Sequence, residues 1–462
     1  MNLRQLPPLF IRVFERLGES VKKGVLANRL FSLLSMGLGV VGFAGSASAE
    51  LSLAGVFTDR MVVQRDKPLV IWGTATPGEM VTVEFAGRTA SAAADDRGSW
   101  RVTLEPIAAD AVGKPLLARL IDAQPGDDHR VVKDVVVGDV WLLAGGGNCG
   151  RLVMSLPDPE TTAKAFETEA FPLVRTAVVP PKTAADPVSD VKLVWGAVGQ
   201  GDPKRIPTEA AWLAKAIADH ENVPVGVIAI ANPKPVECWM SREMLTATSD
   251  AKPILDFYAS DAWKGMTSGS FEERMKAWLD YNQKLPLNPL PKPKPDDDTT
   301  LPQQEPAAVW NGMVAPLTPL SIRGIVWHHG EDWQSQNRAG HQGKLLGAMI
   351  PAWREAFRGP GLPFAVVQLE PHRYATQIPG VGIDGRMAAE LREAQREAAE
   401  QADAMFVTTI DLPVDPPPTM LGQRIADVLH ADTLSKKTGR DWLVLKRRTT
   451  RSCSRSRTPM AA

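Results

Sequence analysis

The sequence predicts an α/β fold in two parts, a β-sandwich followed by a domain built around a parallel sheet. Between Leu51 and Lys133, apolar and polar residues alternate in short segments that turn signals separate, which is typical of antiparallel strands. After Gly150, helical and strand patterns take turns, as in a βα succession. Residues 134–150, DVVVGDVWLLAGGGNCG, join the two parts, and we expect the chain to be organised around them.

Composition and charge narrow the class of protein. The chain has 462 residues, of which 44% are hydrophobic and 23% charged, as expected for a soluble protein with a sizeable core. The formal net charge is −1, but residues 1–49 carry +4 and the stretch beyond Asp441 carries +6, which leaves −11 between them. A body this acidic argues against a nucleic-acid partner.

The first 49 residues have the pattern of a signal peptide. A basic segment precedes the apolar run Leu30–Gly45, and small residues follow at 46–49, so cleavage is expected after Ala49. The run is short for a membrane span, and an uncleaved anchor is the alternative. We therefore predict an exported protein, periplasmic or extracellular, with no membrane association after cleavage.

Residues 50–133 are predicted to form the β-sandwich as an accessory domain. The segment MVTVEF at 80–85 alternates strictly, and it lies between a Pro-Gly turn at 77–78 and an Asp-Arg-Gly turn at 96–98. Short alternating strands between such turns are typical of sandwiches. None of these residues offers catalytic chemistry.

The joining stretch predicts a ligand site. Val135–Val137 and Val140–Leu143 are dense enough in apolar residues for a strand buried on both faces. The strand breaks at Gly145–Gly147, followed by Asn148. The carboxyl ends of strands are where ligands gather in open α/β sheets, although a plain strand-to-helix connection would also fit.

Residues 134–435 are predicted to form the α/β domain, with a helix at Glu209–His220, a strand at Val223–Ala231 and a last strand at Val407–Leu412. Residues 284–305 are Pro-rich and charged, which indicates an extended surface insertion. Residues 436–462 form a basic tail that we expect to be disordered; a shifted reading frame or a truncation would explain it.

These segments resemble the sialate O-acetylesterase family of the SGNH hydrolase superfamily. The matching residues lie at 61–65, 72–73, 77–79, 81–83, 138–141, 145, 148, 237–239, 311–313, 315–318, 324, 327, 330–331, 391–395 and 422–424. The resemblance covers about residues 53–430. It implies a three-layer α/β/α SGNH-hydrolase-like domain with an N-terminal β-sandwich domain, ester hydrolysis of acetylated sugars, and no cofactor.

The chain departs from the family at four chemical positions. Gly147 stands where the nucleophilic serine belongs, and the oxyanion turn is replaced by Asn232–Pro235. His329 replaces a glutamine; in the last loop Asp415 corresponds to the triad acid, and Pro417 occupies the position of the histidine. Without nucleophile and base the family's covalent mechanism cannot operate. We therefore predict little or no hydrolytic activity.

The cleft that remains predicts a binding protein for a glycan or an acetylated sugar. The family positions that would line it are Trp141, Asn148, Trp239, Trp327, His329 and Glu331. Two alternatives stay open: an active carbohydrate O-acetylesterase with a rearranged site, and a decaying gene without a working product.

Histidines and cysteines near this cleft offer further chemistry. His328, His329, Glu331 and Asp332 are neighbours in sequence, but successive residues of an extended segment point to opposite faces, so we predict no metal site. Cys149 and Cys238 both follow strands and could form a disulfide. Cys149 served by His329 is an alternative nucleophile. His430 is interpreted as a histidine at a helix C-terminus.

Overall fold

The computed structural model describes residues 50–121, 129–168, 170–284, 305–330, 339–371 and 385–438. Within this range the chain belongs to one compact unit, which begins at Ala49. The predicted signal peptide lies outside the described residues, as do residues 285–304 of the Pro-rich segment and residues 439–462 of the tail.

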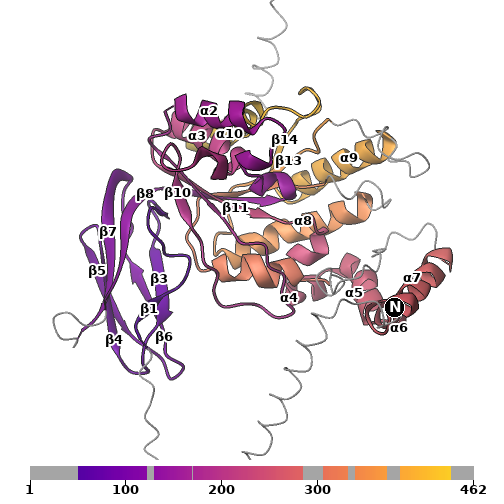
Figure 1. Cartoon of the computed structure of the whole chain (residues 1–462), viewed down its shortest axis with the longest axis horizontal. Coiled ribbons are helices and arrows are strands. Elements are labelled where there is room, and N and C mark those ends of the chain that lie inside the picture. The colour runs from indigo at the N-terminus through magenta and orange to yellow at the C-terminus, as the bar shows by residue number, and fades with distance from the viewer. Residues whose placement is uncertain are drawn as a thin grey trace, which may run out of the picture. The chain divides into compact units, whose positions relative to one another are not determined.

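The N-terminal strands form two sheets (Figure 1). One is antiparallel and contains β1 (Ser52–Leu53), β3 (Leu69–Thr74) and β6 (Ser99–Leu104). The other contains β2 (Val62–Gln64), β4 (Met80–Phe85), β5 (Arg88–Ala93), β7 (Asp110–Leu120) and the first part of β8 (His129–Gly145). Strand β6 buries every second residue, as the alternation predicts. Buried side chains of both sheets belong to one hydrophobic cluster.

Strand β8 continues into the central sheet, whose order is β10-β9-β11-β8-β12-β13-β14. Its other strands are β9 (Val174–Val178), β10 (Trp195–Ala197), β11 (Val225–Ala231), β12 (Gly324–His328), β13 (Phe364–Val367) and β14 (Met405–Val407). The pairs are parallel except for β10 with β9. Residues 135–145 of β8 are all buried, which confirms the prediction of a strand covered on both faces.

Helices cover both faces of the central sheet (Figure 1). On one face lie α2 (Pro159–Thr168), α3 (Thr208–Glu221) and α10 (Pro418–Thr438), and on the other lie α8 (Ala339–Ala356) and α9 (Gly385–Gln401). Alternate residues of β8 face the two layers: Trp141 and Leu143 join the cluster with α3 and α10, whereas Leu142 and Ala144 join that of α8 and α9. The predicted three-layer α/β/α architecture is confirmed.

Short helices fill the stretch between β11 and β12. They are η5 (Val236–Trp239), α4 (Arg242–Thr246), η6 (Ser249–Ala251), α5 (Lys252–Ala259), α6 (Asp261–Thr267), α7 (Phe271–Lys284), the π-helix η8 (Trp310–Val314) and η9 (Ala315–Leu317). Helices η3 (Val153–Ser155) and η4 (Pro203–Arg205) lie earlier in the chain. No helix in the described part of the chain is both long and apolar enough to cross a bilayer.

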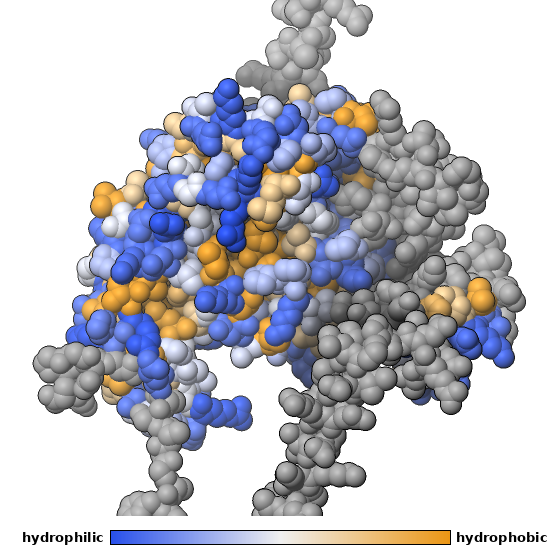
Figure 2. Space-filling view, viewed as in Figure 1, coloured by the Kyte–Doolittle hydropathy of each residue, from blue (hydrophilic) through white to orange (hydrophobic). Residues whose placement is uncertain are grey.

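The surface drawn in Figure 2 mixes hydrophilic and hydrophobic residues. Large apolar side chains are exposed on several elements, among them Met80 on β4, Val112 on β7 and Phe271 on α7. Single exposed apolar residues of this kind are normal for a folded protein.

Two boundaries differ from the sequence-based expectation. The predicted domain boundary at 133–134 falls inside β8, and the separation into two domains, with a β-sandwich as a domain of its own, stays a prediction. The last strand is Met405–Val407 rather than Val407–Leu412. Thr409 leaves the sheet because its N–H donates to Gln368 Oε1 and its hydroxyl donates to Gln368 O.

A buried carboxylate locks the N-terminal strands to the central strand. Asp139 of β8, which is 1% exposed, accepts two hydrogen bonds from Arg65 at 2.9 and 2.8 Å and one from Gln64 at 3.0 Å. Gln64 Oε1 in turn accepts from the N–H of Val140. The hydrogen bond with Asp139 raises the pKa of Arg65. The segments at 61–65 and 138–141 therefore supply a structural connection between strands rather than a catalytic group.

Replacement of this carboxylate should destabilise the fold. Asp139→Ala removes the acceptor of three hydrogen bonds and leaves Arg65 only the more distant Glu221, at 3.5 Å. Loss of one partner of a buried ion pair costs about 3 kcal/mol or more. Urea unfolding of the full chain measures the loss. Asp96→Ala, at an exposed position of the same part of the chain, is the control. Equal stability of both variants would contradict the role assigned to Asp139.

Candidate active site

The candidate active site lies at the carboxyl edge of the central sheet, where β8 ends between β11 and β12. Gly145, the last residue of β8, is in register with Ala231 on one side and His328 on the other. Its φ is +147°, and a Cβ at this position would lie 2.0 Å from the His328 carbonyl oxygen, so only glycine fits. The strands that follow β8 lie on one side of it up to β11 and on its other side from β12 onward. This change of side makes the edge a topological switch point.

Gly147 occupies an open position two residues beyond this edge. It is exposed and begins the short 3₁₀ helix η2 (Gly147–Gly150), with half-buried Asn148 as the next residue. A Cβ added to Gly147 would meet no heavy atom within 4 Å, and the backbone is not in the left-handed region. Space and backbone therefore accept a serine at this position; only the side chain is missing.

The backbone of the turn after β11 holds no spare hydrogen-bond donor. Asn232 donates its N–H to Gly145 O at 2.8 Å, and Lys234 donates its N–H to the Asn232 side chain at 3.2 Å. Pro233 and Pro235 have no N–H. The backbone of this turn therefore offers no donor to an oxyanion, as the prolines in the sequence predict.

His329 packs in the interior beside this turn. It is 1% exposed, its Nε2–H donates to Lys234 O at 2.8 Å, and its ring stacks on Trp327 with centroids 5.4 Å apart. Burial lowers the pKa of His329 to about 3, so the imidazole is neutral at neutral pH. Its Nε2–H is therefore used inside the protein.

The three tryptophans expected in the cleft are buried. Trp141 is 4% exposed, and Trp239 and Trp327 are 0% exposed. Trp239 and Trp327 pack edge to face with centroids 5.1 Å apart, and the Trp239 Nε1–H donates to Lys234 O. Such burial argues for a packing role and leaves little ring surface for a sugar. The other expected lining residue, Glu331, lies outside the described residues.

The last loop brings an exposed aspartate, but no histidine, toward the edge. Asp415 has a φ of +52° and donates its N–H to Pro371 O at 3.2 Å, in the segment that follows β13. Pro417 is exposed and accepts N–H groups from the first turn of α10. His430 lines a pocket with Asp139, near the opposite ends of the strands, and stacks on His220. No imidazole from α10 therefore faces Gly147.

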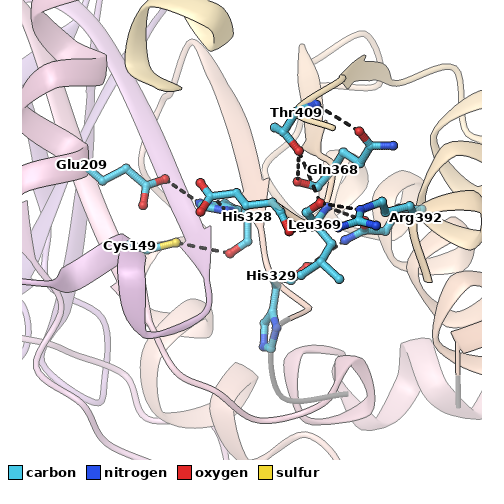
Figure 3. A network of polar contacts seen from close by, with 10 residues as sticks. Cys149, Glu209, His328, His329, Gln368, Leu369, Arg392 and Thr409 are labelled. Atoms are coloured by element: carbon cyan, nitrogen blue, oxygen red, sulfur yellow. Dashed lines mark hydrogen bonds and ion pairs between the residues drawn. The ribbon is translucent and has the colours of Figure 1, made fainter. Parts of the chain in front are cut away.

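The histidine at the centre of this edge is His328 rather than His329. Its Nδ1 lies 2.7 Å from Glu209 Oε1, and its Nε2 lies 3.5 Å from Glu370 Oε1. Cys149 is fully buried, and its Sγ contacts the His328 carbonyl oxygen at 3.4 Å. The structure thus brings Cys149, Glu209 and His328 together (Figure 3).

Sequence reasoning missed this group because its members are far apart in the chain. From the sequence, His328 is considered together with its neighbours at 329–332 as a metal site, and Cys149 is considered together with His329 as a nucleophile. The sequence offers one signal, the position of Glu209 directly before the apolar residues 210–214 of a helix. Glu209 is 4% exposed in the structure, and a buried carboxylate requires a partner. Cys149 and Cys238 are both buried thiols.

A second group of polar contacts holds the neighbouring strand ends (Figure 3). Arg392 of α9 donates to Leu369 O and Glu370 O at 2.9 and 3.1 Å. Gln395, one turn along, donates to His329 O and accepts the N–H of Leu369, both at 2.8 Å. These contacts give the segment at 391–395 a positioning role.

Fold and edge together define a three-layer α/β/α protein with a candidate site at the carboxyl end of its central strand. Comparison with a solved carbohydrate acetylesterase from Xanthomonas citri gives a TM-score of 0.61 with 24% sequence identity, over 82% of this chain and 74% of that one. This likeness concerns the fold. No family model matches the chain.

Curated relatives of the chain are sialate O-acetylesterases. The chain is 24% identical over 351 residues to sialate O-acetylesterase from Rattus norvegicus and 26% identical over 348 residues to that from Homo sapiens, in each case across 70% of this chain. The matches span 61% and 58% of those relatives' lengths. The chain is thus similar in sequence to sialate O-acetylesterases, in agreement with the resemblance of its motifs.

The buried imidazole of His329 predicts a pH-dependent stability. The folded protein keeps His329 neutral down to about pH 3, whereas the unfolded chain takes up the proton below about pH 6.5. The unfolded state therefore binds more protons in this window, and acidification should lower the free energy of unfolding by up to about 1.4 kcal/mol per pH unit. His329→Gln keeps a donor for Lys234 O and should flatten this dependence in urea titrations.

The control separates titration from packing. Trp327→Phe removes part of the ring stacked on His329 but leaves the imidazole, so it should lower stability at every pH and keep the slope. A slope in His329→Gln equal to that of the unmodified chain would show that another group titrates.

Proposed function

We propose that this chain is a glycan-binding relative of the carbohydrate esterases with little or no hydrolytic activity. The observation that carries the proposal is the position of Gly147, an exposed residue without a side chain at the switch point of the sheet. Acyl transfer at this point needs an attacking side chain and a base, and residue 147 supplies neither.

The surroundings of Gly147 support the same proposal. The nearest thiol in sequence, Cys149, is buried, with its Sγ against the His328 carbonyl oxygen. The backbone donors of the turn at 232–235 are already used, as are the Nδ1 of His328 and the Nε2 of His329. Three parts of the mechanism are thus altered together, and no single change would restore it.

Binding of an acetylated sugar is the part of the family's function that these changes leave available. The space beside Gly147 is open, and half-buried Asn148 offers an amide donor and acceptor beside it. Curated relatives are named for action on O-acetylated sialic acid, which is therefore the first ligand to test.

Acetate release tests the inactive state. The full chain should release no acetate from O-acetylated sialic acid or acetylated xylose above a heat-inactivated control. The double variant Gly147→Ser, Pro417→His restores the nucleophile and an imidazole, yet it should remain about 10²–10³-fold slower than an intact family enzyme because the turn lacks an oxyanion donor. Turnover by the unmodified chain would instead support an active esterase with a rearranged site.

A matched pair of variants tests the binding site by calorimetric titration with the same sugars. Gly147→Trp fills the open space beside β8 and should abolish saturable binding. Gly361→Trp places the same side chain at another glycine with open surroundings and an ordinary backbone, and it should bind normally. Equal binding by both variants would move the sugar away from this edge.

We also propose that the protein is exported. The basic segment, the apolar run Leu30–Gly45 and the small residues at 46–49 support cleavage after Ala49. Mass spectrometry of the chain secreted by a bacterial host should find Glu50 as the first residue. Retention of the complete N-terminus in the membrane fraction would instead indicate an uncleaved anchor.

A further inference from the structure

The group formed by Cys149, Glu209 and His328 has the composition of a metal site. One potential ligand atom from each residue, a sulfur, an oxygen and a nitrogen, lies within 4.8 Å of the other two. We propose that these three residues bind a divalent transition metal of the zinc class. The proposal stands apart from glycan binding and does not rest on it.

The donor set selects the class of metal. Thiolate, imidazole and carboxylate are the ligands that Zn²⁺ takes in proteins, usually in a tetrahedron. Mg²⁺ and Ca²⁺ prefer oxygen ligands alone, so the sulfur and the ring nitrogen disfavour them. A three-residue set leaves a fourth tetrahedral position for a water molecule or another small ligand.

The ligand atoms lie close to the separations that a metal requires. Bonds of about 2.0–2.3 Å to a tetrahedral zinc separate its ligand atoms by roughly 3.3–3.8 Å. His328 Nδ1 and Glu209 Oε1 are 2.7 Å apart, so these two atoms would move apart by about 0.5–1 Å on metal binding.

The second nitrogen of the His328 ring faces a carboxylate, as is usual for a metal-bound histidine. His328 Nε2 lies 3.5 Å from Glu370 Oε1, and a ligating imidazole ordinarily donates its other N–H to a carboxylate. The backbone of Glu370 is held by Arg392. Glu370 can therefore fix the ring with Nδ1 toward Glu209, as Figure 3 shows for the labelled pair.

Charge and burial favour a cation at this point. Cys149, Glu209 and His328 are all buried, and two carboxylates, Glu209 and Glu370, face one imidazole. A cation at this point therefore meets a carboxylate, an imidazole and a thiol in the interior, where bonds to the metal can replace the contacts among them.

Anchoring of the ligands makes the site preformed. The start of α3 is tied to η2 because the Thr208 N–H donates to Arg151 O at 3.0 Å. The Gly146 N–H donates to His328 O at 2.9 Å and joins the same segment to β12. Elements that carry all three ligands are thus hydrogen-bonded to one another before any metal binds.

Cobalt titration tests the proposal directly. The full chain, stripped with a chelator and dialysed, should bind one Co²⁺ with a thiolate-to-cobalt charge-transfer band in the near ultraviolet, which Zn²⁺ should then displace. Cys149→Ser should abolish this band. Cys238→Ser removes an equally buried thiol that is no part of the group, and it should keep the band at full strength.

A second variant distinguishes the loss of a metal ligand from misfolding of the protein. Glu209→Gln keeps the size of the side chain and a hydrogen bond to His328 but removes the charge, and it should weaken Zn²⁺ binding by about 100-fold or more. No cobalt band in the unmodified chain, a band that persists in Cys149→Ser, or unchanged zinc affinity in Glu209→Gln would each overturn the proposal.

Discussion

The end of β8 is the constraint on which the rest of the structure depends. At Gly145 three parallel strands meet in register so closely that a single methyl group would collide with the carbonyl oxygen of His328. That contact fixes the start of η2, the turn after β11 and the imidazole after β12 at one place. The chemistry that this edge can perform depends on the side chains and backbone groups at these three positions.

The residues that this chain shares with the family motifs hold the fold together. Asn311 donates its side-chain N–H groups to the carbonyls of Ala184 and Ala185. A Cβ on Gly312 would lie 2.1 Å from Lys182 O. Asp139 and Arg65 tie the N-terminal strands to β8. Each would be costly to replace whatever the protein does.

The sequence was sufficient for the layers and the buried strand, because periodicity and turn residues report local structure. It could not place Glu209 beside His328, since 119 residues separate them and only the crossover through the sheet joins them. Trp239 and Trp327 illustrate the same limit: residue type alone does not tell a ring that stacks on a sugar from one buried in the core. His329 was identified as a departure, but its burial required the fold.

The turn at 232–235 sets what a substitution at this edge can change. A side chain at residue 147 needs one substitution, into space that is already open. A backbone donor in the turn needs more, because Pro233 and Pro235 must both be exchanged while Trp239 and His329 still hold the carbonyl of Lys234 between them. Engineering of this edge therefore involves two tasks of unequal size: a side chain is one replacement, whereas a backbone donor is a rebuilt loop.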